Sequence, residues 1–134
     1  MSPLQRLRLP EQLPEPISQY TDGVFADGWI WVSGMLALDA SGTLIGGDDV
    51  VAQAERVHEN IRAVLVKAGA GFEDVVKVTV YLRHIGDRAA VNTVRRRFFG
   101  ESRPASTLVE VSAFVIPDAL VEIDAVAFQP QGER

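Results

Sequence analysis

The residues best suited to chemistry lie near the end of the chain, in the stretch RPASTLVEVSAFVIPDALVEIDAVAF at residues 103–128. Its two apolar runs contain Glu110, Glu122 and Asp124, and Arg103 precedes a Pro-Ala-Ser sequence. A carboxylate can orient and deprotonate a water molecule. A guanidinium group can hold the carboxylate of a ligand through a pair of hydrogen bonds. This stretch is therefore the first candidate for a ligand-binding cleft.

These side chains also have interpretations without chemistry. Side chains alternate along a strand, so Glu122 and Asp124 share one face, and either can simply point to solvent on an outer strand. Arg103 is either a surface residue before a turn proline or a cation that reaches back into the cleft. The arginine run at residues 95–97 is typical of a solvated helix face.

Composition bounds the class of protein. A chain of 134 residues with a hydrophobic fraction of 47% is expected to form one domain, residues 1–134, around a single core. Prolines in residues 1–16 favour an extended N-terminal arm. The sequence has no cysteine, which excludes disulfides and suits a cytoplasmic location. No apolar run approaches the roughly 20 residues of a membrane span.

Charge and motif spacing argue against several ligands. The net charge of −5 argues against nucleic acid, which usually contacts a basic face. No group of His, Asp or Glu has recognisable metal-ligand spacing, so no metal is expected. No glycine-rich phosphate loop with its lysine is present, and we expect no cofactor. The expected partner is a small-molecule substrate or ligand, with no membrane contact.

Periodicity and turn signals predict the elements that carry these residues. They are strands at 20–25 and 29–33, a helix at 50–67, a strand at 75–83, a helix at 88–99, and strands at 107–115 and 120–128. Asp48 or Asp49 is expected to cap the first helix, and Asp87 the second. Gly69 and Gly100 stand where the two helices should end.

Two helices can cover only one face of such a sheet. The strand at 29–33, WIWVS, is apolar on both faces, and so is much of the strand at 107–115. A large apolar face is seldom left in water. We therefore expect a homo-oligomer that buries the helix-free face, because symmetric association is the usual solution.

Several short motifs occur in an order and at spacings that resemble a known family. They are YTDGV, VSGM, QAERVHENIRAVLVKAGAGFEDVVKVTVYL, VNTVRRRFF, RPAS, VEV and VEIDAVA. Together they resemble the RidA family of reactive-intermediate deaminases, also called the YjgF or liver perchloric-acid-soluble protein family. The resemblance covers about residues 15–128.

The resemblance implies a chorismate-mutase-like α+β fold, with a mixed sheet and two helices on one face, and a homotrimer with ligand clefts between subunits. In the founding members the reaction is the hydrolysis of enamines and imines to keto acids and ammonia. Such hydrolysis needs a carboxylate to orient and deprotonate water, and the resemblance gives that catalytic role to Glu122.

The expected substrate-binding residues follow from the same resemblance. Active family members carry an arginine immediately after Pro-Ala, where this chain has Ser106, and Arg103 can replace that guanidinium. Tyr20 matches the cleft tyrosine, Asn92 the VN position of the second helix, and Ser33 is a candidate cleft hydroxyl. Each also has a plain structural interpretation, as an edge-strand, helix-surface or strand-end side chain.

Three functions remain open. The first is an enamine or imine deaminase, a hydrolase whose specificity is altered by Ser106. The second is a small-molecule-binding trimer that has lost the reaction. The third is an endoribonuclease or translation inhibitor, which the acidic charge and the lack of a basic stripe disfavour.

Overall fold

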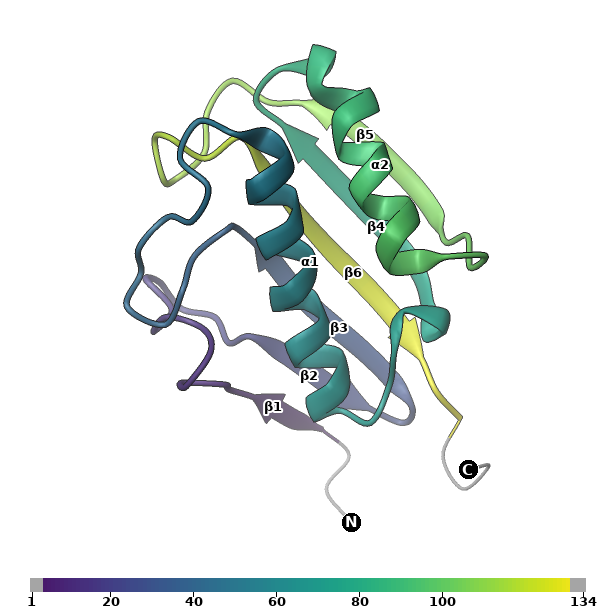
Figure 1. The fold of residues 1–134 in the computed structure, drawn as a ribbon. Coiled ribbons are helices and arrows are strands. Elements are labelled where there is room, and N and C mark those ends of the chain that lie inside the picture. Colours follow the sequence, from purple (N-terminus) through teal and green to yellow (C-terminus); the bar gives the residue numbers. More distant parts are fainter. Residues whose placement is uncertain (1–3, 131–134) are drawn as a thin grey trace.

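Six strands form one mixed sheet, and helices α1 and α2 lie on the same face of it (Figure 1). The computed structural model describes residues 4–130. Its elements are β1 (Gln5–Leu7), β2 (Gly23–Ala26), β3 (Trp29–Met35), α1 (Val50–Lys67), the short 3-10 helix η1 (Phe72–Asp74), β4 (Val75–Leu82), the short 3-10 helix η2 (Ile85–Asp87), α2 (Arg88–Phe99), β5 (Ala105–Glu110) and β6 (Val121–Phe128). The α+β fold expected from the sequence is confirmed. Residues 1–3 and 131–134 of the expected domain lie outside the described residues.

The sheet order is β1-β2-β3-β6-β4-β5. Neighbouring strands are antiparallel except β4 and β5, which are parallel. Parallel neighbours need a crossover connection, and α2 supplies it. This crossover places α2 beside the edge strand β5, on the helix-covered face (Figure 1).

Helix α1 spans the residues predicted for it, because the signals at its two ends and its apolar periodicity indicate the same range. The Asp49 side chain accepts hydrogen bonds from the backbone N–H groups of Val51 (2.9 Å) and Ala52 (3.3 Å), so Asp49 is the N-cap. Gly69 follows the helix with a φ of 84°, a conformation that glycine adopts without steric cost.

Several predicted details differ in the structure. The strand predicted at 20–25 is β2 at 23–26, and the strand predicted at 29–33 continues to residue 35 as β3. Asp87 precedes α2, but its side chain makes no capping hydrogen bond, because η2 holds this residue in a helical conformation. The strand predicted at 107–115 is β5 at 105–110, since its register ends with Glu110 opposite Leu82, the last residue of β4. Strand β1, absent from the predicted order, pairs with β2 at the opposite edge of the sheet.

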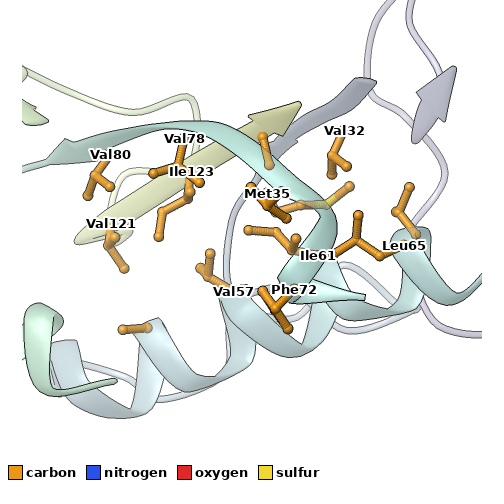
Figure 2. Packing of buried hydrophobic residues seen from close by; sticks show 14 of the residues in the cluster. Val32, Met35, Val57, Ile61, Leu65, Phe72, Val78, Val80, Val121 and Ile123 are labelled. Atoms are coloured by element: carbon orange, nitrogen blue, oxygen red, sulfur yellow. The ribbon is translucent and has the colours of Figure 1, made fainter. Parts of the chain in front are cut away.

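The core lies between the sheet and α1. Figure 2 shows Val57, Ile61 and Leu65 of α1 in the cluster that also contains Val80 of β4 and Ile123 of β6. All five side chains are at most 1% exposed. The helical spacing of the α1 residues places them on one face of the helix, and the two-residue spacing of the strand residues places them on one face of the sheet. These two apolar faces pack together and hold α1 on the sheet.

The side chains of strand β6 alternate without exception between the two faces of the sheet. Its core-facing residues are all buried: Val121, Ile123, Ala125 and Ala127. The intervening Glu122 and Asp124 therefore point to the helix-free face, where both are partly exposed. Burial of the apolar set is thus what places the two carboxylates.

The helix-free face carries large apolar side chains. Trp29 is 42% exposed, Trp31 is 53% exposed, and Val109 on β5 is 39% exposed. Val126 and Phe128 of β6 are partly exposed on the same face. In one chain this apolar surface lies open, as the sequence predicts.

His58 is a buried titratable group that supports the helix packing. It lies on α1, is 1% exposed, and stacks on Phe98 of α2 with ring centroids 4.9 Å apart. Its Nδ1–H donates to the carbonyl oxygen of Ala54 at 2.7 Å. Burial lowers the pKa of His58 from 6.5 to about 4, so the folded protein holds it neutral.

We predict an acid-dependent loss of stability that originates at His58. Between pH 6.5 and about 4 the unfolded chain binds a proton that the folded chain does not. The free energy of unfolding should therefore fall with pH across this window, by about 3 kcal/mol in total. Urea unfolding at a series of pH values should show this fall for the wild type and a flatter profile for His58→Leu. His84→Leu, at an exposed histidine, is the control. Parallel profiles for the wild type and His58→Leu would contradict the assignment.

Candidate functional site

A cavity of about 490 Å³ opens beside the end of β3. Its lining includes Tyr20, Ser33 and Glu122, three of the residues that the sequence singles out. They come from the segment before β2, from β3 and from β6, so the sheet brings together positions far apart in the chain. Gly34 and residues 13–18 of the N-terminal segment complete much of the wall. We call this space the Glu122 cavity.

A glycine gives Glu122 its place in the cavity. A Cβ atom on Gly34 would lie 2.8 Å from Glu122 Oε2 and 3.1 Å from its Cδ. The β3–β6 register shifts between Val32 and Met35, at this same point. The absent side chain and the irregular register together leave room for the carboxylate.

The surroundings of Glu122 favour its protonated form. Burial, and then the negative charge of Asp124, raise the pKa of Glu122 above its ordinary value. Asp124 lies two residues along the same face and accepts a hydrogen bond from the Tyr81 hydroxyl at 3.0 Å. A carboxyl group with a raised pKa that faces a cavity is suited to take up and release protons.

Ser33 and Tyr20 offer polar groups to the same cavity in different ways. Ser33 Oγ donates to the carbonyl oxygen of Thr21 at 2.6 Å, which leaves its oxygen as an acceptor. Tyr20 is 52% exposed, and its hydroxyl makes no hydrogen bond with the described residues. Tyr20 can therefore contact a ligand without losing an internal bond.

An ion pair that sequence reasoning missed anchors the wall of the cavity. Asp22, only 5% exposed, accepts hydrogen bonds from the Arg8 side chain and from the backbone N–H of Leu9, the latter at 2.8 Å. Arg8 also contacts Glu15 in the cavity wall at 3.3 Å. Nothing in the spacing of Arg8 and Asp22 signals this contact, because it joins segments that meet only in the fold.

The other expected ligand residues lie elsewhere in the chain. Asn92 and Arg103 line a separate hollow of about 610 Å³ at the end of α2, which we call the arginine hollow. Ser106 is exposed on β5, and its side chain points to the helix-covered face, since Ser106 pairs with the core residue Val78. The arginine hollow and the Glu122 cavity have no lining residue in common.

Arg95 also lines this hollow, although the arginine run at residues 95–97 predicts a solvated helix face. Its Nη2 donates to Ser106 Oγ at 3.0 Å, and the residue is only partly exposed. A signal for it did exist: residues 92, 95, 96 and 99 recur at helical spacing, and all four line the hollow.

The part of the chain that the structure describes contains neither a group of metal ligands nor a membrane-spanning helix. Residues 4–130 contain no group of three or more His, Cys, Asp or Glu side chains that could hold a metal ion. No helix among them is long and apolar enough to cross a membrane.

Known proteins are similar to this chain in sequence and in fold. The family described as endoribonuclease L-PSP matches residues 10–129. The 3-aminoacrylate deaminase RutC of Acinetobacter baylyi is 40% identical over 119 residues, which cover 89% of this chain and 94% of that protein. The 2-iminobutanoate/2-iminopropanoate deaminase of Capra hircus is 39% identical over 127 residues, covering 94% and 91%. The crystal structure of E. coli TdcF with bound serine has a TM-score of 0.84 at 29% identity, covering 93% and 98%.

We predict that Asp124→Asn lowers the pKa of Glu122. The amide removes the negative charge that helps to raise this pKa, while burial remains, so the value should fall only part of the way. The measurement is an NMR titration of the Glu122 carboxyl carbon in both proteins. Glu73→Gln, which removes a carboxylate from η1, should leave the titration unchanged. An unchanged or raised pKa in Asp124→Asn would contradict the charge effect.

Proposed function

Because this chain belongs to the family described as endoribonuclease L-PSP, we propose that it is a deaminase that hydrolyses small enamines or imines without a cofactor. The observation that carries the proposal is the partly buried Glu122, with a raised pKa, beside a cavity large enough for a small molecule. Relatives named as deaminases, at about 40% identity over most of their length, support it.

The proposed reaction is a hydrolysis that Glu122 assists by moving protons. Water attacks the carbon of the C=N bond, and the Glu122 carboxylate takes a proton from that water as the C–O bond forms. The Glu122 carboxyl group passes this proton to the nitrogen, which gives a carbinolamine. The hydroxyl proton of the carbinolamine then also moves to the nitrogen by way of the same carboxylate, the C–N bond breaks, and ammonia leaves as the carbonyl product forms. An enamine first becomes an imine by accepting a proton on carbon. Water supplies the oxygen, so the reaction needs no oxidant or reductant.

We also propose that the active assembly is a homotrimer with clefts between subunits. The Glu122 cavity contains Tyr20, Ser33 and Glu122, whereas the arginine hollow contains Asn92 and Arg103. Ser106 lies beside the arginine hollow, since it is bonded to Arg95 in the lining. Within one chain Glu122 points to the helix-free face, whereas Ser106 points to the helix-covered face. A second copy packed against the open face can bring its own half of the set to the first copy, and it buries Trp29 and Trp31 as well.

Specificity is the part of the proposal that depends on position 106. A serine there removes the guanidinium that active members of the family carry after Pro-Ala, and Arg103 is exposed and bonded to no described residue. We propose that the preference among small imines and enamines, 2-iminobutanoate included, differs in degree from theirs as a result. A trimer that binds but does not hydrolyse, and an endoribonuclease, are the alternatives that the first experiment below separates.

The proposal predicts that Glu122→Gln abolishes hydrolysis while the fold is kept. The amide cannot accept a proton from water, so kcat should fall by about 10²–10⁴-fold. Hydrolysis is measured with 2-iminobutanoate generated in the assay by an amino-acid oxidase. The melting temperature should stay close to that of the wild type. Wild-type protein that leaves 2-iminobutanoate untouched would overturn the proposal, in favour of the endoribonuclease if it cleaves RNA and of the binding trimer if it does not. Full activity in Glu122→Gln would overturn the role of Glu122.

A matched pair of glycine variants moves the same carboxylate without removing it. Gly34→Ala places a Cβ 2.8 Å from Glu122 Oε2, too close for an unchanged carboxylate position, and the end of a flexible side chain can shift without unfolding the protein. Hydrolysis should therefore fall in Gly34→Ala. A Cβ at Gly86 meets nothing within 4 Å, so Gly86→Ala is the control.

The proposed assembly predicts a mass of about three times the 14.6 kDa chain in light scattering. Trp31→Glu should shift the protein to smaller species, because it adds charge to the open face. Val66→Glu is the control, since Val66 is 63% exposed but lies on α1, away from that face. A wild-type monomer, or a trimer unaffected by Trp31→Glu, would contradict this assembly.

A further inference from the structure

Arg95 reaches from α2 to strand β5 and makes one hydrogen bond there. Its Nη2 donates to Ser106 Oγ at 3.0 Å, so a neutral hydroxyl fixes the position of the charged group. The short side chain of Ser106 and the long side chain of Arg95 thus form a pair.

No described residue forms an ion pair that balances the charge of Arg95. Among residues 4–130 it makes no ion pair, although Arg97 on the same helix pairs with Glu55, and Arg62 pairs with Glu59. Burial alone lowers the pKa of Arg95, with no anion beside it to offset the loss of water. A partly buried guanidinium bonded only to a hydroxyl has donors left for an anion from outside.

The arginine hollow around it is suited to an anion. Arg95, Arg96 and Arg103 all line it, and Glu101 is the single carboxylate among its lining residues. Asn92 adds an amide that can bond a second polar group of a ligand. Its volume of about 610 Å³ accommodates a small organic molecule.

We propose that Arg95, from α2, binds the carboxylate of the substrate in place of the arginine that active family members carry after Pro-Ala. This inference rests on the proposed deaminase function and assigns a residue of this chain to the carboxylate site of the same cleft. The guanidinium enters the cleft from α2, and the Ser106 hydroxyl holds it in place. Glu122 of a neighbouring copy faces the reacting carbon of the same ligand.

The kinetic test compares two arginine variants of the same helix. Arg95→Ala should raise KM for 2-iminobutanoate by about ten- to a hundredfold, the loss expected for one charge-assisted hydrogen bond. Arg97→Ala removes the same charge outside the hollow and should leave KM unchanged. An imine without a carboxylate, released from butylamine by a flavin amine oxidase, should be hydrolysed equally by wild type and Arg95→Ala. Equal KM values for 2-iminobutanoate in wild type and Arg95→Ala would overturn the inference while the deaminase function stands.

A second variant tests whether position 106 shares the site with Arg95. Ser106→Arg combined with Arg95→Ala returns a guanidinium to the hollow from β5 instead of α2. This double variant should recover much of the lost affinity, and KM should move back toward the wild-type value. A double variant no better than Arg95→Ala would contradict a shared site.

Binding of the reaction product separates this inference from the proposed function. Calorimetric titration with 2-oxobutanoate needs no catalysis, and its carboxylate should contact Arg95 as that of the substrate does. We expect weaker binding by about ten- to a hundredfold in Arg95→Ala, and unchanged binding in Arg97→Ala. If the wild type lacks hydrolysis but shows this difference, the proposed function fails and the carboxylate site remains. Equal binding by all three proteins, or no binding by the wild type, would overturn the site itself.

Discussion

The alternation of apolar and acidic side chains along β6 is the constraint on which the rest of the structure depends. Its core-facing residues anchor the sheet to α1, and each large one contributes about 1.5–3 kcal/mol by burial. A shift of one residue would bury Glu122 and Asp124 in the core and expose the apolar set. Burial of two unpaired carboxylates costs so much free energy that the shifted register is excluded. The same packing that stabilises the fold therefore fixes the carboxylates on the helix-free face, where one of them meets the cavity.

The helix-free face combines an exposed apolar surface with a carboxyl group that has a raised pKa. It is too apolar for a surface in water, with Trp29 and Trp31 about half exposed, and it carries a carboxyl group whose pKa is raised by burial and by Asp124. A second copy that covers the tryptophans would exclude further water from the cleft. It would also supply the cationic half of the site, which one chain keeps on its other face, around Arg95. Assembly and chemistry then depend on the same contact.

Much of the fold can be predicted from the sequence because its signals are local. Both helices occupy the predicted residues, and β6 follows from its two-residue period. The cap expected at Asp87 does not form, because a 3-10 turn decides the conformation there. The sequence also leads to Glu122, and the fold brings Tyr20 and Ser33 to the same cavity. The contacts of Arg8 with Asp22 and of Arg95 with Ser106 were not predicted, because each joins segments that only the tertiary structure brings together.

The central claim is that one cleft combines Glu122 of one copy with Arg95 of its neighbour. Mixed oligomers test it most directly. Glu122→Gln and Arg95→Ala chains with different affinity tags are produced together, and oligomers that carry both tags are assayed with 2-iminobutanoate at a concentration well below the wild-type KM. Every cleft in either parent lacks one of the two groups, whereas a mixed oligomer contains a cleft with both intact. We predict hydrolysis well above that of either parent, with the wild-type KM. A mixed oligomer no more active than its parents would contradict the shared cleft.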